Sequence, residues 1–142
     1  MRMLAAAALA ALLAPLPAAA QDWHRVGGRE NGTQYIDLAS IKPDGELLRA
    51  NGVAVFAPVE GYEGPARVVT IAQFDCKASG IHFLRFEAYA RDGALLEALD
   101  NPHEGFVTAS PGTPFGDSLD FVCNLDRSRA ARVADPLKEP QE

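Results

Sequence analysis

The sequence predicts a small, exported, mostly β-stranded domain with one helix near its C-terminus and one disulfide. Three observations lead to this fold class. The chain begins with an apolar leader, two neighbouring stretches show apolar residues alternating with polar ones, and there are two cysteines. No nucleotide-binding, hydrolase or zinc-protease motif occurs, so residue chemistry defines the fold class without naming a ligand.

The leader has the three parts of a secretory signal peptide. Arg2 supplies the positive start, residues 4–16 form the apolar middle, and Ala18-Ala19-Ala20 provides the small residues that signal peptidase requires. We therefore expect cleavage after Ala20 and a periplasmic or secreted product. A membrane anchor is the alternative, but the apolar run is shorter than the roughly 20 residues that span a bilayer and prolines interrupt it. No Cys follows that would carry a lipid.

The size and charge of the remainder bound its function. Cleavage would leave 122 residues (142 minus 20), for which we expect one domain over 21–126 and a weakly structured tail over 127–142. The leader holds one of the 13 basic residues and none of the 19 acidic ones, so the net charge becomes 12 minus 19, or −7. Nucleic acids and anionic membranes are not expected partners, because both select clustered Lys and Arg.

The two cysteines, Cys76 and Cys123, favour a disulfide. An exported chain meets an oxidising compartment, where a single pair of cysteines is normally bonded. A metal pair and a reactive thiol are the alternatives. The sequence has no C-x-x-C or H-x-x-C spacing, which a metal site would favour.

The centre of the predicted sheet is an antiparallel pair, residues 68–76 and 81–89, joined by a turn over 77–80. Cys76 falls on the apolar side of the first strand. Strict alternation in the second strand predicts two faces. One carries His82, Leu84, Phe86, Ala88 and Ala90; the other carries Phe83, Arg85, Glu87, Tyr89 and Arg91.

Four further strands complete the expected sheet. Residues 22–27, with Trp23, and 33–37 form a hairpin around the turn signal Asn31-Gly32. A strand over 46–57 contains Asn51-Gly52, which indicates a bulge or a bend. A last strand over 94–99 follows the turn Arg91-Asp92-Gly93, with a helix as the rival interpretation.

Polar residues and prolines mark the connections. Asp37 is placed to cap a short helical turn over 37–41. The Gly- and Pro-rich residues 58–65, with an exposed Tyr62, and residues 101–105 are expected to be loops.

The segment Pro111-Gly112-Thr113-Pro114 predicts a helix start, with Thr113 as the N-cap and Pro114 in the first turn. The spacing of the next apolar residues places them on one stripe facing the sheet. These residues are Phe115, Leu119, Val122 and Cys123. The helix would continue weakly through 127–132, and an acidic tail would follow from residue 135.

The candidate chemical groups are scattered, and we expect no catalytic, cofactor or metal residues. His24, His82 and His103 are far apart in the sequence, and His82 is expected to pack beside apolar neighbours. One interpretation of Asp75, and of Glu87 beside Arg85 and Arg91, is an acid pair in a cleft. Charge pairs on a solvated face are the simpler interpretation. A small basic patch of Arg127, Arg129 and Arg132 either docks a partner or complements the helix dipole.

Taken in order, several of these segments resemble the surface-adhesin protein E family of Gram-negative bacteria. The resemblance rests on Trp23, Tyr35-Ile36-Asp37 with Ser40-Ile41, Phe74-Asp75-Cys76, Tyr89 followed by Gly93, and Pro111-Gly112-Thr113 leading to Val122-Cys123. Thr113 and Asp117 stand where the family pattern has Ser and Glu, and both retain the capping chemistry. The Arg that the pattern places after Cys76 is absent, and the loops at 58–65 and 101–110 belong to this chain alone.

The resemblance implies an α+β fold, a curved antiparallel sheet of about six strands covered by one C-terminal helix that a Cys76–Cys123 disulfide ties to the sheet. It also implies a non-catalytic binding protein at or near the cell surface, with a host or envelope protein as partner. Two alternatives stay open, a periplasmic carrier of a small ligand or haem, with His82 as the haem ligand, and a small periplasmic enzyme. An exposed edge strand would also permit a homodimer.

Overall fold

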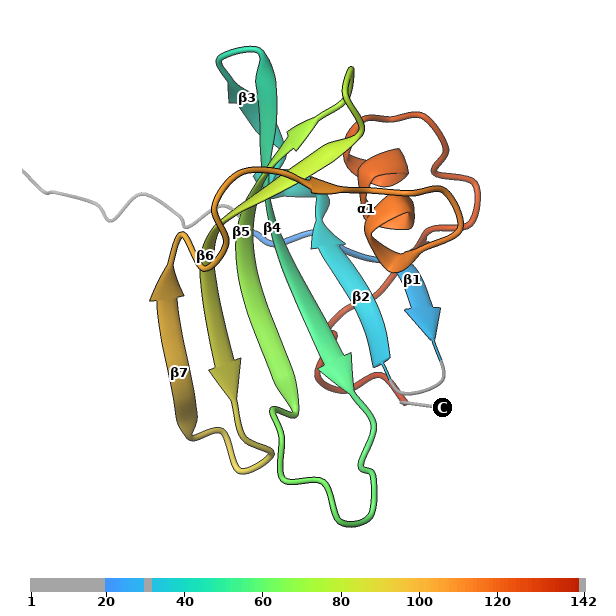
Figure 1. Cartoon of the computed structure of the whole chain (residues 1–142). Coiled ribbons are helices and arrows are strands. Elements are labelled where there is room, and N and C mark those ends of the chain that lie inside the picture. The colour runs from blue at the N-terminus through green and yellow to red at the C-terminus, as the bar shows by residue number, and fades with distance from the viewer. Residues whose placement is uncertain (1–19, 30–31, 141–142) are drawn as a thin grey trace, which may run out of the picture.

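In the computed structural model, which describes residues 20–29 and 32–140, the chain folds into one antiparallel sheet with one α-helix packed against it (Figure 1). The described part of the sheet has nine strands in the order β7-β6-β5-β4-β2-β1-β9, with β3 paired to β4 and β8 to β6. The expected signal peptide, apart from Ala20, and Asn31 of the expected turn lie outside the described residues.

Six strands are long, and they correspond to the six expected from the sequence. They are β1 (Trp23–Arg29), β2 (Gly32–Asp37), β4 (Leu47–Phe56), β5 (Arg67–Asp75), β6 (Gly80–Tyr89) and β7 (Leu95–Asp100). The other three are the short strands β3 (Lys42–Asp44), β8 (Val107–Thr108) and β9 (Ala131–Arg132). The expected number of strands was therefore too low, because segments of two or three residues are too short to show alternation.

The sheet has two buried faces with separate cores. On the face that we call the helix face, Ala50, Ala72 and Phe74 pack with Leu119 and Val122 of the helix α1 (Pro114–Val122). The opposite face, which we call the back face, carries a smaller cluster of Tyr35, Val53 and Val55, packed against Trp23, Val69 and Val133. The C-terminal segment covers part of the back face, and its Val133 N–H donates to the Trp23 carbonyl at 2.9 Å.

A β-bulge in β6 changes which side chains face the helix. Ile71 of β5 lies opposite Arg85, but the next residue, Ala72, lies opposite Phe83, so Leu84 has no partner in β5. Directly opposed residues share a face. The helix face of β6 therefore carries Ile81, Phe83, Phe86 and Ala88. The alternation expected for His82 and Phe83 was wrong, because a bulge reverses the faces on one side of it.

A second expected irregularity is absent. The register of β4 runs without a shift past Asn51 and Gly52 in its pairing with β5, and from Phe56 to Gly52 in its pairing with β2, so the predicted bulge there was wrong. Gly52 has a packing role instead. A Cβ atom at this position would lie 3.1 Å from Thr70 Oγ1 and 3.2 Å from Ile36 Cδ1, which only a glycine avoids.

The helix α1 begins as the sequence predicts. Thr113 Oγ1 accepts a hydrogen bond from the Gly116 N–H at 3.1 Å, and Pro114 occupies the first turn. The helix ends at Val122, and residues 131–132 form strand β9 on β1, so the extension expected over 127–132 was wrong. Its most buried side chains include Phe121, which is 1% exposed, whereas Phe115 from the predicted stripe is 38% exposed.

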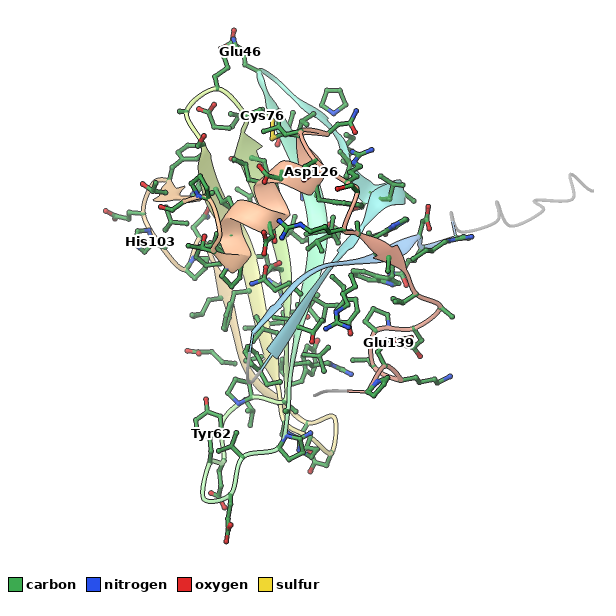
Figure 2. All side chains as sticks on the ribbon, turned by 90° about the vertical axis from the view of Figure 1, so that its right-hand side faces the viewer. Glu46, Tyr62, Cys76, His103, Asp126 and Glu139 are labelled. Atoms are coloured by element: carbon green, nitrogen blue, oxygen red, sulfur yellow. A yellow bond between two sulfur atoms is a disulfide. The ribbon has the colours of Figure 1, made fainter. Side chains whose placement is uncertain are left out.

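The disulfide ties the C-terminal end of α1 to the end of β5. Cys76, directly after β5, is bonded to Cys123, the C-cap of α1, with the two Cα atoms 5.7 Å apart. Figure 2 shows the Cys76 side chain beside the helix end. At the C-terminal end of β2, Asp37 caps the short 3₁₀ helix η1 (Leu38–Ser40) by accepting from the Ala39 N–H at 3.1 Å, as expected.

None of the helices within residues 20–29 and 32–140 has the length and apolar character needed to cross a membrane.

Candidate binding site: an apolar cleft on the helix face

A cleft of about 550 Å³ lies on the helix face of the sheet. The helix α1 lies over one end of the sheet and leaves the lower parts of β4, β5 and β6 without a helix above them (Figure 1). Strands β2, β4, β5 and β6 form the floor of the cleft. The loop residues Pro102 and His103 and the first turn of α1 form its border.

Small residues on adjacent strands create the hollow. Ala50, Gly52 and Ala54 alternate along the helix face of β4, and Ala72 lies opposite Ala50 on β5. These side chains fill little space, so the helix at one end and the aromatic residues around the floor leave a gap between them. The aromatic lining residues are Phe56, Phe74, Phe83, Phe86 and Phe115. The rings of Phe83 and Phe115 lie 5.6 Å apart and join the floor to the helix.

The cleft has few polar groups, and the best placed of them are already bonded to each other. Ser118 Oγ on α1 donates to Gln34 Oε1 on β2 at 2.7 Å and lies 3.0 Å from the Pro114 carbonyl oxygen. Thr113 Oγ1 is used for the helix cap. Among the lining residues, His103 is the one basic side chain, and it belongs to an exposed loop (Figure 2).

This arrangement suits an apolar group that carries no charge. Small-molecule sites are typically concave, largely preformed and about 300–1,000 Å³ in volume, with apolar walls and a few polar groups. A buried ion without a partner would lose its hydration without compensation. The lining residues within the described chain include no carboxylate and no Lys or Arg that could provide such a partner.

The free edge strand β7 flanks the cleft. All six of its residues are exposed, and three are leucines: Leu95 is 56%, Leu96 52% and Leu99 40% exposed. Leu99 lies opposite Phe86, a residue of the cleft floor, so both occupy the helix face. The strand interpretation of residues 94–99 is confirmed and the helix alternative was wrong.

The charged residues singled out in β6 form a network on the back face. Arg85 forms ion pairs with Glu87 and Asp100, each at 2.7 Å, and Glu87 also accepts from the Tyr89 hydroxyl at 2.5 Å. The hydrogen bonds from Tyr89 and Arg85 lower the pKa of Glu87, and the bond to Glu87 raises the pKa of Tyr89. The charge-pair interpretation of Glu87 and Arg85 is confirmed.

Arg91 is not part of that network. It donates instead to the Phe56 carbonyl at 3.4 Å.

The three histidines lie in different places. His24 Nε2 is 3.2 Å from Asp22 Oδ1, and the His24 ring packs on Phe121. His82 lies on the opposite side of β6 from Phe83, where its Nδ1 is 3.2 Å from Gln73 Oε1, so it does not line the cleft. Only His103 does so. Within residues 20–29 and 32–140, no three His, Cys, Asp or Glu residues gather as metal ligands would.

The remaining candidate residues have local structural roles. Asp75 caps the turn after β5 by accepting from the Lys77 and Ala78 N–H groups at 3.0 and 2.9 Å.

The three C-terminal arginines each have a separate contact. Arg127 donates to the Phe121 carbonyl at 2.7 Å, Arg129 lies 3.5 Å from Asp117, and Arg132 bonds Asp22 at 2.7 Å. Arg127 therefore complements the C-terminal end of α1, as the helix-dipole interpretation expects, whereas Arg129 and Arg132 pair with acidic residues elsewhere. Docking of a partner by these arginines stays a prediction.

Sequence reasoning missed the cleft itself. A usable signal was present, because three small residues at every second position, 50, 52 and 54, leave one face of a strand without bulk. The bulge in β6 hid the second half of the site by placing Phe83 and Phe86 on the same face.

A comparison with protein families agrees with this architecture. The model of the family described as surface-adhesin protein E matches residues 23–124, from β1 to just past the disulfide. No curated protein and no solved structure matches the chain. Because the family match covers most of the chain and includes the long strands, the helix and both cysteines, the chain belongs to the surface-adhesin protein E family.

Proposed function

We propose that this protein is an exported, non-catalytic binding protein that holds an apolar, uncharged group of its ligand in the helix-face cleft. The observation that carries the proposal is the cleft of about 550 Å³, whose walls are almost entirely apolar. The family to which the chain belongs is named for surface adhesion, which supports a binding role.

The lining residues support binding over catalysis. Nucleophilic catalysis requires a hydroxyl or thiol next to a general base. The hydroxyl groups of Ser118 and Thr113 are engaged with Gln34 and with the helix cap, and both cysteines are in the disulfide. His103 is the remaining candidate base on the described lining, and no bonded nucleophile accompanies it there.

Export is part of the proposal. The leader with its cleavage motif after Ala20 and the Cys76–Cys123 disulfide both suit a periplasmic or secreted protein. Intact-mass measurement of protein from a periplasmic fraction tests this directly. We expect a chain that begins at Gln21 and has no free thiol. Uncleaved protein confined to the cytoplasm would contradict export.

A neutral fluorescent probe tests the cleft. Nile red emits strongly only in apolar surroundings, and we expect the oxidised protein to bind it with saturation. Ala54, on the cleft floor, is replaced by Phe to fill the hollow, and we expect binding to be lost while the fold remains. Ala98→Phe is the matched control, because Ala98 lies on the back face opposite Glu87. Equal binding by wild type and Ala54→Phe would refute the cleft as the site.

Haem is a weaker candidate ligand for this site. The expected haem ligand, His82, does not line the cleft, and the single histidine on its border, His103, lies on an exposed loop.

A protein is the second candidate partner, and the exposed strand β7 favours it. Leu99, on the helix face, continues the apolar surface at the side of the cleft. With a net charge of −7 after cleavage, nucleic acid is not proposed as a partner. A homodimer through β7 would be a further use of the same edge.

A further inference from the structure

We propose that the outer edge of β7 binds an extended, basic segment of a partner protein by strand addition. This inference concerns the protein partner of the proposed function and uses a surface separate from the cleft floor. It rests on three properties of β7, namely its unpaired edge, its exposed leucines and its charge.

The edge is open and regular. In the described chain β7 ends the strand order, and one side of it pairs with β6. The Asn101 N–H donates to the Leu84 carbonyl at 2.9 Å. Because N–H directions alternate along an antiparallel strand, the Leu99 and Glu97 N–H groups also point to β6, and those of Ala98 and Asp100 point outward. These outward groups are the ones that a strand partner would use.

The usual protection of an edge is mostly missing from this strand. Edge strands are commonly guarded by Lys, by Pro, by a covering segment or by extreme shortness. Residues 95–100 contain neither Lys nor Pro, and the one register shift lies near the start of the strand, between the pairs Tyr89–Leu95 and Ala88–Glu97. At the other edge of the sheet, β9 covers part of β1. Of the two edges of the described sheet, β7 is therefore the one available to a partner strand.

The charge of β7 selects the partner. The strand carries Glu97 and Asp100 and no basic residue, and Arg85 beside it is already held by Glu87 and Asp100. A second copy of β7 would bring two more carboxylates to the same interface, which like-charge repulsion disfavours. Glu97 lies opposite Ala88 on the helix face and Asp100 lies opposite Arg85 on the back face, so an extended segment with Lys or Arg on both of its faces and apolar residues between them would match both the carboxylates and the leucines.

The test uses synthetic peptides of the same length as β7 and the oxidised protein. A fluorescently labelled peptide of valine and lysine, with lysine on both faces of the extended strand, is titrated with the protein, and the matching valine–glutamate peptide is the charge control. We expect the lysine peptide to bind, with an affinity that falls as salt rises, and the glutamate peptide not to bind. Absence of lysine-peptide binding would overturn the proposal.

Two pairs of variants locate the binding surface. Ala98→Pro removes one outward N–H group without removing a bond to β6, and we expect it to abolish peptide binding, whereas Ala98→Val keeps the N–H and should bind normally. Glu97→Lys should weaken binding of the lysine peptide roughly tenfold. Binding that survives Ala98→Pro unchanged would overturn the strand-addition geometry.

Two outcomes separate this inference from the function proposed above. Nile red binding by Ala98→Pro should equal that of wild type, so loss of the peptide alone identifies the edge and loss of the dye alone identifies the cleft. Dimerisation of the free protein that disappears in Ala98→Pro, without peptide binding by wild type, would show that a second copy occupies the edge and would overturn the basic partner.

Discussion

Ser118 on α1 and Gln34 on β2 are joined by a hydrogen bond of 2.7 Å across 84 residues of sequence, at the border of the cleft. Ser118 is almost fully buried, and Gln34 is partly buried. This bond attaches the middle of the helix to the sheet, while the disulfide attaches its C-terminal end.

Replacing Ser118 by Ala should lower the free energy of unfolding by about 1 kcal/mol, because Gln34 Oε1 loses its donor in a partly buried place. Urea denaturation at neutral pH measures the change. Ser110→Ala, at an exposed position just before the helix, is the control and should have a much smaller effect. A double variant with Gln34→Leu should recover part of the loss. If both serine variants behave alike, the bond does not stabilise the fold.

Removal of the disulfide should have the largest effect on stability. For a sequence separation of 47 residues, the chain-entropy model gives about 4 kcal/mol. We expect Cys76→Ala with Cys123→Ala to unfold at a much lower denaturant concentration than the oxidised wild type. Wild type under reducing conditions should approach the stability of the double variant. Equal stability of oxidised and reduced protein would contradict the prediction.

Tyr35→Phe should stabilise the protein. The Tyr35 side chain is 1% exposed in the back-face cluster, and its hydroxyl has no hydrogen-bond partner among the described residues. Deleting the hydroxyl removes the cost of burying an unsatisfied polar group, so we expect a gain of about 1 kcal/mol in the free energy of unfolding. Thermal and urea denaturation both report it. A loss of similar size would show that the hydroxyl has a partner after all.

The stability contributed by Glu87 should depend on pH. Hydrogen bonds from Tyr89 and Arg85 lower its pKa in the folded protein below the ordinary value of 4.5. A carboxylate with a lowered pKa contributes stability above its unfolded pKa and loses that contribution as pH falls through the folded pKa. Glu87→Gln should therefore be less stable than wild type at pH 7. The two proteins should converge in acid, below about pH 4.

The measurement is a series of urea denaturations at decreasing pH. Glu60→Gln, on the exposed loop after β4, serves as the control because its carboxylate lies in an exposed turn away from Arg85. A constant difference between wild type and Glu87→Gln at every pH would show that the network does not depend on ionised Glu87.

Much of the fold follows from local sequence chemistry. Four features depend on residues with a strong preference for one local structure or bond, such as an N-cap threonine or a pair of cysteines in an exported chain. They are the hairpin of β5 and β6, the Asp37 cap, the start of α1 at Thr113 and the disulfide. These features are present where the sequence places them.

The features that the sequence did not reveal depend on partners distant in the chain. Leu84 is the unpaired residue of the bulge only because Ala72 lies opposite Phe83, and no local signal marks it. Strand β9 exists because β1 offers an edge to Ala131 and Arg132. Phe121 is buried by Arg127 and His24 as well as by the sheet, which no helical stripe predicts. The cleft depends both on the small residues of β4, which are local, and on the register between β5 and β6, which is not, so the sequence alone does not predict it.

The attachment of α1 to the sheet at two points, its middle and its C-terminal end, affects how the cleft binds a ligand. Because Ser118 is bonded to Gln34 and Cys123 to Cys76, the helix at the border of the cleft is already in position in the folded protein. Little conformational entropy of α1 is therefore lost when a ligand binds, so a rigid apolar ligand retains more of its interaction energy as affinity. Association should then proceed in a single kinetic phase, as expected for a receptor whose binding conformation already dominates the free protein.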